Sequence, residues 1–208
     1  MNKRQKILIA VASLILTGIY FTPLWKITLD APQYPEGLGL YIWVNKISGE
    51  NQHDLRTING LNHYIGMKEI TPESIPELKI MPYFVGFLIL TGLLAAWIGK
   101  RKILGVWAFL FLAILIAGLV DFYLWEYDYG HNLNPHAAIK IPGMSYQPPL
   151  IGSKQLLNMH TTSLPSIGGI LAGLSFLITL YVLFVSRKNT SITEEKNHVA
   201  VKPIPGAA

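Results

Sequence analysis

Four long apolar runs limit what this chain can fold into more than any other feature of its sequence. They cover residues 7–25, 81–99, 103–125 and 167–186, and none holds an internal Lys or Arg. Each has about the 20 residues that an α-helix needs to cross a hydrocarbon core of ~30 Å. An open sheet would leave its backbone unpaired in lipid, so helices are expected. Since only 14% of the residues are charged, against about 25% in an average soluble domain, the sequence predicts an all-α integral membrane protein with four transmembrane helices.

The first run also has the beginning of a secretory signal peptide, because the basic segment MNKRQK precedes it. The residues that follow, TGIYFTPLWK, are bulky and aromatic and offer no small-residue cleavage site. We therefore interpret the run as an uncleaved anchor. Cleavage would leave three spans and would not change the side on which the later loops lie.

Basic residues indicate the orientation of the four spans. They gather at the three places that this topology puts on one side of the membrane: Lys3, Arg4, Lys6, Lys100, Arg101, Lys102, Arg187 and Lys188. The positive-inside rule makes that side cytoplasmic, together with the N- and C-termini. The net charge of +5 is then an orientation signal. No basic stripe with interleaved aromatic residues occurs, so no nucleic-acid partner is expected.

The two segments on the other side, residues 26–80 and 126–166, exceed the roughly 2–8 residues that usually connect packed helices. Their Tyr, Trp, Leu and Ile content argues against disorder. We expect them to form a small cap over a single membrane domain of residues 1–188. Within them, GLGLYIWVNKI is β-prone and TPESIPELK resembles a capped helical turn. Residues 189–208 are predicted to be a disordered cytoplasmic tail.

Histidine and methionine are concentrated on the external side. Five of the six histidines and all four internal methionines lie in the external loops or at their boundary, although Met fits easily into apolar helices. Imidazole and thioether ligands together suit copper, and thioethers favour Cu(I). The chain has no Cys, which excludes thiolate metal sites and disulfides. The predicted ligands of an external copper site are His63, Met67, His131, His136, Met144, Met159 and His160.

The spacing of these residues is not a sharp metal-binding signature. His63 and Met67 are four apart, which a helical turn would place on one face, although Gly66 between them weakens such a helix. Met159 and His160 are adjacent and would point to opposite sides of a strand. Because exposed loop histidines are ordinarily just solvated, a purely structural interpretation stays open beside the metal site.

The outer end of the third run combines acidic and aromatic residues. Asp121, Glu126 and Asp128 lie there, and they are either an entry point for cations or a solvated face. The neighbouring Tyr and Trp side chains are typical of an aromatic belt at a membrane interface. No serine-hydrolase elbow, phosphate-binding loop, dinucleotide-binding glycine motif or zinc-protease motif occurs. The chain is therefore not expected to be an enzyme.

Three segments resemble a known family: DAPQYPEGLGLYIW (30–43), INGLNHYIGM (58–67) and GLVDFYLWEYDYGHNLNPHAAIKIPGMSYQPPLIGSKQLLN (118–158). They are similar to small polytopic membrane proteins found alongside the maturation genes for nitrous oxide reductase, sometimes fused to or neighbouring the copper chaperone of that system. The resemblance assigns no active residues. It implies a role in denitrification at the periplasmic face of a bacterial inner membrane, with nitrous oxide reductase or its copper chaperone as partner.

Two hypotheses follow from the residues and the resemblance. In the first, the chain is an accessory membrane protein that binds or relays copper through external His and Met residues. In the second, the external loops are a metal-free docking surface for a periplasmic or electron-transfer partner.

Overall fold

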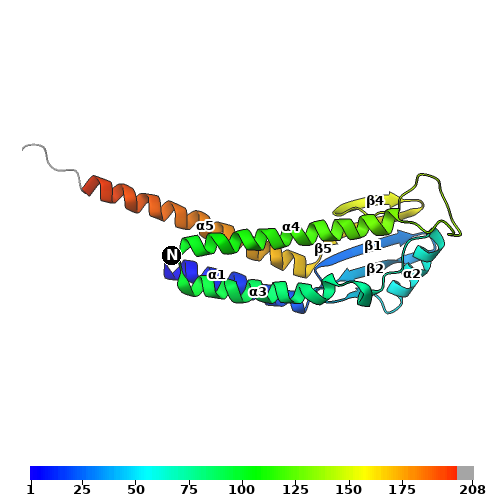
Figure 1. Ribbon diagram of the computed structural model, residues 1–208, viewed down its shortest axis with the longest axis horizontal. Helices are drawn as coiled ribbons and strands as arrows, with labels where there is room; N and C mark the ends of the chain where they lie inside the picture. Colours follow the sequence, from blue (N-terminus) through cyan, green and yellow to red (C-terminus); the bar gives the residue numbers. More distant parts are fainter. Residues whose placement is uncertain (201–208) are drawn as a thin grey trace, which may run out of the picture.

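A computed structural model describes the backbone of residues 1–200 and the side chains of residues 1–187. The molecule is elongated: four helices run along its long axis, and a sheet with one short helix lies at one end (Figure 1). The helices are α1 (Lys3–Ile15), α2 (Asp54–Ile65), α3 (Glu77–Ile98), α4 (Arg101–His131), α5 (Ile167–Ala200) and the 3-10 helices η1 (Leu16–Tyr20) and η2 (Pro72–Ser74). The strands are β1 (Trp25–Ala31), β2 (Tyr34–Ile42), β3 (Ile47–Gly49), β4 (Gly152–Leu156) and β5 (Met159–Pro165).

The prediction of an all-α protein with four transmembrane helices is wrong. Both segments expected to be loops contribute strands to a five-stranded antiparallel sheet of order β3-β2-β1-β5-β4. Three helices of the described chain are long and apolar enough to cross a membrane: Glu77–Ile98, Arg101–His131 and Ile167–Arg187. The first apolar run divides instead: residues 7–15 belong to α1, which begins at Lys3, and residues 16–20 form η1. Its last residue, Trp25, already belongs to β1.

Two strands of the sheet are joined directly to helices of the bundle. β1 follows α1 and η1, β5 leads into α5, and the two strands pair with each other, Trp25 opposite Pro165. In β1, Ile27 pairs with Leu40 on one side and with Ser163 on the other. Because side chains alternate along a strand, these residues share one face of the sheet. The opposite face is polar. There Lys26 donates to Glu50 at 2.6 Å, and this hydrogen bond raises the pKa of the Lys26 amine.

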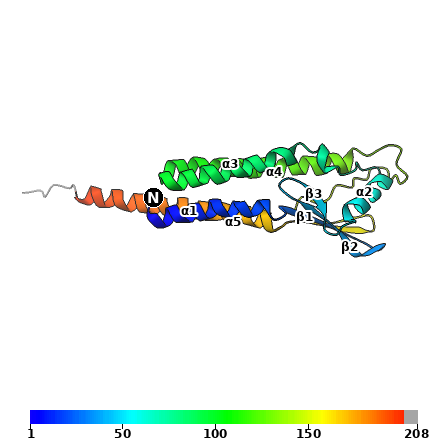
Figure 2. The ribbon, with the colours of Figure 1, turned by 90° about the horizontal axis from the view of Figure 1, so that it is seen from below.

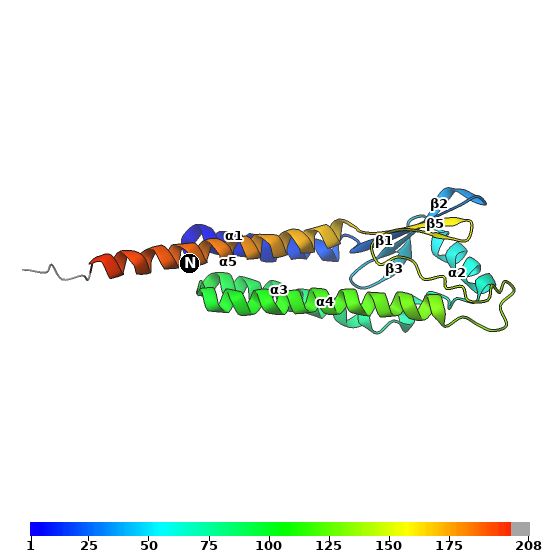
Figure 3. The same ribbon diagram turned by 90° about the horizontal axis from the view of Figure 1, so that it is seen from above.

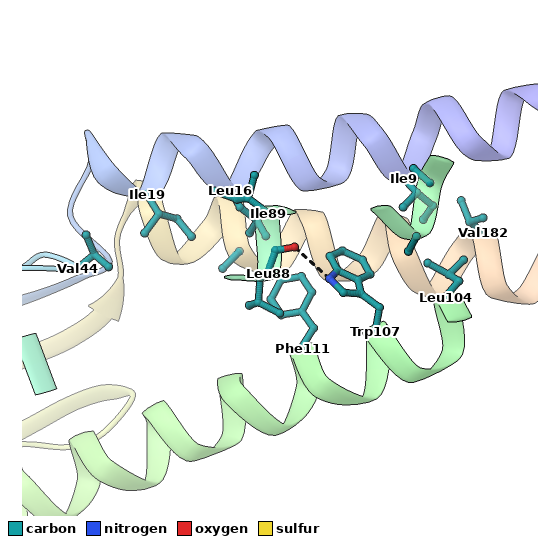
Figure 4. Close-up of a cluster of buried hydrophobic side chains, with 13 residues drawn as sticks. Ile9, Leu16, Ile19, Val44, Leu88, Ile89, Leu104, Trp107, Phe111 and Val182 are labelled. Atoms are coloured by element: carbon teal, nitrogen blue, oxygen red, sulfur yellow. Dashed lines mark hydrogen bonds between the residues drawn. The ribbon is translucent and has the colours of Figure 1, made fainter. Parts of the chain in front are cut away.

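In the bundle each helix has two neighbours: α1 packs against α3 and α5, and α4 also packs against α3 and α5 (Figures 1, 2 and 3). Apolar side chains from all four meet in one core, in which Trp107 and Phe111 of α4 are 2% and 1% exposed (Figure 4). The Trp107 indole N–H donates to the Leu88 carbonyl of α3 at 3.1 Å. The Ser175 hydroxyl of α5 donates to the Ala12 carbonyl of α1 at 2.8 Å. Such hydrogen bonds are common between helices in a lipid environment.

Gly92 of α3 is a point of close approach within this core. A Cβ atom there would lie 2.2 Å from Ser13 Oγ and 2.6 Å from Trp107 Cζ2. We expect Gly92→Ala to lower the thermal unfolding midpoint of the purified protein, although Ala favours an isolated helix by ~1 kcal/mol. Gly105→Ala in α4 is the matched control, because no described atom lies within 4 Å of its added Cβ. Equal midpoints for the two variants would contradict the packing seen here.

The N-terminus lies at the end of the bundle away from the sheet (Figure 1). Its amino group donates to the Gly99 carbonyl at 3.0 Å, and Lys6 Nζ donates to the Trp97 carbonyl at 3.0 Å. Both positive groups therefore satisfy free carbonyls at the C-terminal end of α3, where cations are favoured. The basic turn between α3 and α4 lies at this same end. The helix α5 continues past the predicted start of the disordered tail, residue 189, to Ala200, and residues 201–208 lie outside the described part.

The outer end of α4 extends beyond its neighbour. Its 31 residues make a helix of about 46 Å, which exceeds a hydrocarbon core of ~30 Å. α3 has 22 residues and runs antiparallel to it (Figure 1), and Asp121 of α4 lies near Glu77, the first residue of α3. Residues from about 123 onward therefore lie past the spanning part of the bundle, alongside the sheet. We call the sheet, α2 with the segment of residues 66–76 that follows it, this end of α4 and the loop of residues 132–151 the cap.

Candidate functional site

The four predicted histidine ligands lie at the surface of the cap. His63 is exposed on α2, His136 in the loop after α4, and His160 on β5. His131 ends α4 and stacks on Tyr127, with ring centroids 4.0 Å apart. Among the described side chains, no three His, Asp or Glu residues gather closely enough to hold a metal ion. The fold thus distributes these four histidines over α2, α4, the loop after α4 and β5.

Two of the predicted methionine ligands meet in one cavity beneath the sheet. Met159 of β5 is 7% exposed and lines it together with Met67. His160 is exposed on the other face of β5, which confirms the predicted alternation. Met144 is half-buried in the loop of residues 132–151 and is not among the lining residues.

Met67 reaches the cavity because α2 stops before it. The helix ends at Ile65, and Gly66 takes a left-handed conformation with φ of 83°, which glycine adopts without a steric penalty. The predicted weakening of a helix at Gly66 is therefore confirmed, and the shared helical face that the spacing of His63 and Met67 allowed does not form: His63 is exposed, whereas Met67 is half-buried. The segment after the turn is held by Asn59, whose side chain accepts from the Ile70 amide at 2.8 Å and donates to the Ile70 carbonyl at 3.0 Å.

The cavity lies between one face of the sheet, α2 and the outer end of α4. Its volume is about 100 Å³. The lining residues are Ile27, Leu29, Leu40, Ile58, Leu61, Asn62, Ile65, Met67, Ile70, Trp125, Glu126, Tyr129, Tyr146, Pro148, Leu156, Met159 and Thr161. α2 is fixed to the sheet by Asp54, whose carboxylate accepts from the amides of Gly39 and Asn51, each at 3.0 Å. Apolar side chains thus surround a small space that has few polar groups.

Glu126 is the one acidic residue among those lining the cavity. It is completely buried, and neither carboxyl oxygen has a hydrogen-bond partner in the described part of the chain. Burial without a compensating partner disfavours the charged form. It raises the pKa of Glu126, which lies in the cap beyond the spanning part of α4, to about 8. At neutral pH the carboxyl group of Glu126 is therefore mostly uncharged.

The hydroxyl groups of two other lining residues also lack a hydrogen-bond partner. Tyr146 is 3% exposed and Thr161 is 2% exposed, and neither hydroxyl finds a partner among the described residues. Tyr146 is positioned by its amide, which donates to the Gly130 carbonyl of α4 at 3.0 Å. Buried polar atoms in proteins are nearly always satisfied by protein, water or ligand. The indole N–H of Trp125, another lining residue, also has no partner among the described residues, so four such groups around one small cavity mark it as a candidate binding site.

Outside the cavity, the end of α4 is tied to the segment after α2. Lys68 Nζ lies 2.5 Å from the Asp128 carboxylate, and Asn132 also donates to Asp128. These hydrogen bonds hold the pKa of Asp128 below its usual range. The acidic residues expected at the outer end of this helix thus have different surroundings. Asp128 faces solvent and forms an ion pair, whereas Glu126 faces the interior.

Sequence reasoning identified Met67 and Met159 but missed the burial of Glu126 and the roles of Tyr146 and Thr161. The available signal was the spacing of Trp125, Glu126 and Tyr129, which a helix places on one side. Trp125 and Tyr129 were interpreted as part of an interfacial aromatic belt, yet both line the cavity. No known protein-family model and no curated protein matches the sequence.

Proposed function

We propose that the chain is a membrane-anchored accessory protein that handles copper at the periplasmic face of a bacterial inner membrane. It binds or relays copper through residues of the cap, in support of nitrous oxide reductase maturation or function. The three helices that are long and apolar enough to cross a membrane provide the anchor. The cap provides the copper ligands.

One observation carries this proposal. All seven predicted ligands belong to the cap, whereas Lys3, Lys6 and the basic turn after α3 belong to the opposite end of the bundle (Figure 1). Basic residues favour the cytoplasmic side of a membrane, so the His and Met residues face the periplasm. In that oxidising compartment thiols are lost to disulfides, whereas thioether and imidazole ligands remain usable. The resemblance of residues 30–43, 58–67 and 118–158 independently supports nitrous oxide reductase or its copper chaperone as the partner.

Cu(I) binding by the full-length protein tests the proposal. The protein in lipid nanodiscs is titrated anaerobically with Cu(I) against a chromophoric Cu(I) chelator. We expect it to bind Cu(I) more tightly than a variant in which all seven predicted ligands are replaced by Ala. The matched control replaces a His and a Met outside the set, His53→Ala and Met81→Ala, and should bind as the wild type does. Equal binding by the wild type and the seven-residue variant would refute copper handling.

The second candidate, a metal-free docking surface, is favoured by one feature of α2. An open hollow on its outer side is lined by Gln52, Leu55, Arg56, Asn59, Gly60, His63, Tyr64 and Glu69, and Tyr64 is 57% exposed. Aromatic residues at exposed hollows often anchor partners. If docking were the function, association with purified nitrous oxide reductase or its chaperone would survive Ala substitution of the six predicted ligands outside this hollow, and it would be lost in Tyr64→Ala.

A further inference from the structure

We propose that the cavity beneath the sheet is a Cu(I) site whose ligands are the thioethers of Met67 and Met159 and the carboxyl group of Glu126. This inference rests on the proposed function and narrows it, because it assigns the metal to the interior of the cap. The exposed histidines are then not primary ligands. Glu126 is new to the ligand set, since the sequence offered it only as part of an acidic surface.

The three groups come from three elements that the fold holds together. Met67 follows the left-handed turn that ends α2, Met159 begins β5, and Glu126 lies on the outer end of α4. All three line the same cavity of about 100 Å³. Sulfur ligands from thioethers select Cu(I) among the biological metals. Met67 is half-buried and Met159 is 7% exposed, so both thioethers lie largely out of solvent.

Charge balance supports a monovalent ion. Glu126 is the single carboxyl group in a lining that is otherwise apolar or uncharged. A charge in such surroundings is strongly disfavoured unless an opposite charge accompanies it. When Cu(I) enters, the carboxyl group releases its proton to solvent, and one carboxylate neutralises one Cu(I) ion. A divalent ion such as Zn²⁺ would leave a net positive charge in the cavity, and it prefers imidazole and thiolate ligands to thioethers.

The two unpaired hydroxyl groups fit the same assignment. Tyr146 and Thr161 are at least nine-tenths buried, and their oxygens find no partner within the described chain. Each hydroxyl can donate one hydrogen bond. A metal-bound carboxylate keeps acceptor capacity on its second oxygen, and such outer hydrogen bonds usually orient metal ligands. A bound ion, with its carboxylate ligand or a water, would bring partners for these buried polar groups into the cavity.

Substitutions that keep the volume of each side chain test the site. Met67→Leu and Met159→Leu remove the sulfur and preserve the packing, and Glu126→Gln removes the charge. In the same anaerobic Cu(I) competition, we expect each change to weaken binding by more than the ~10- to 100-fold typical of losing an outer-shell partner. The matched control is Met81→Leu, which removes a thioether that belongs neither to the predicted ligands nor to the cavity lining and should leave binding unchanged. The X-ray absorption spectrum of the copper-loaded wild type should contain sulfur ligands, which each Met→Leu variant reduces.

The outcomes separate this inference from the proposed function. If the wild type binds Cu(I) tightly, and the two Met→Leu variants bind equally tightly while a variant of the four exposed histidines does not, the cavity site is overturned and copper handling stands. If the wild type binds no better than the seven-residue variant, copper handling itself fails. Thermal unfolding midpoints identify any variant that does not fold. The two Met→Leu variants carry the test if Glu126→Gln does not fold.

Discussion

Raising the pH from about 5 to about 8 should markedly destabilise the metal-free protein, because Glu126 would have to ionise inside the cavity. Its pKa is raised from 4.5 to about 8 in the folded protein by burial. Between these values the folded state binds more protons than the unfolded state, so stability falls as the pH rises. The slope approaches ~1.4 kcal/mol per pH unit, and the total is on the order of 4–5 kcal/mol at most. The stabilisation is complete below the unfolded value and is lost as the pH passes the folded one.

Unfolding midpoints measured across this range, with a copper chelator present, check the expectation. Glu126→Gln cannot ionise, so its midpoint should vary much less with pH. Asp128→Asn is the matched control on the same helix, because Asp128 is exposed and paired with Lys68. The pKa of Asp128 is lowered in the folded protein, so its ionisation makes the protein more stable as the pH rises, and it does so at lower pH. Tyr129 does not interfere, because burial raises the pKa of this phenol from its model-compound value of 10.0. A wild-type midpoint that stays constant or rises from pH 5 to 8 would rule out an unpaired acid in the cavity.

Three of the four predicted helices could be located from the sequence because their signal is local. Long apolar runs produce α3, α4 and the first part of α5, and the observed ends differ by a few residues from those expected. The first run shows the limit of this reasoning. It has the same apolar content, yet Trp25 at its end pairs with Ile42 and Pro165 in the sheet. Pairing with a residue 140 positions away is a tertiary property that composition does not reveal.

Only parts of the sheet could be predicted from the sequence. The β-prone interpretation of GLGLYIWVNKI is confirmed in part, since residues up to Ile42 belong to β2. β4 and β5 were assigned to a loop, because Gly, Ser, Lys and Asn within residues 152–165 hide a short hairpin. Each of these strands is stabilised by its neighbours more than by its own propensity.

The candidate site was predictable in its location and in two residues. The one-sided distribution of Met pointed to the cap, where Met67 and Met159 share the cavity. The histidines followed the same sequence pattern but lie on the surface. The sequence offered Glu126 as part of a cation entry point or of a solvated face, and neither alternative predicts its complete burial. Which face of α4 is buried depends on the sheet that covers it, and that sheet was not predicted.

Gly130→Ala should separate the loop that carries Tyr146 from the end of α4. A Cβ at residue 130 would lie 2.4 Å from the Gln147 backbone nitrogen and 2.5 Å from its Cα atom. Neither backbone atom can rotate away as a side chain can, so the loop must move. The hydrogen bond from the Tyr146 amide to the Gly130 carbonyl, now 3.0 Å, would break. Overpacking of this kind typically costs ~1–3 kcal/mol.

A lower unfolding midpoint would be specific evidence for this contact, because helix propensity alone predicts a higher one. Ala in an exposed helix interior is more favourable than Gly by ~1 kcal/mol. Gly60→Ala in α2 is the control: no described atom lies within 4 Å of its added Cβ, and its midpoint should stay constant or rise. Gly130→Ala should lower the midpoint and accelerate hydrogen exchange at the Tyr146 amide, which loses its acceptor. If both variants were equally stable, the loop would not pack against α4. Tyr146 and Pro148 would then not form a wall of the cavity.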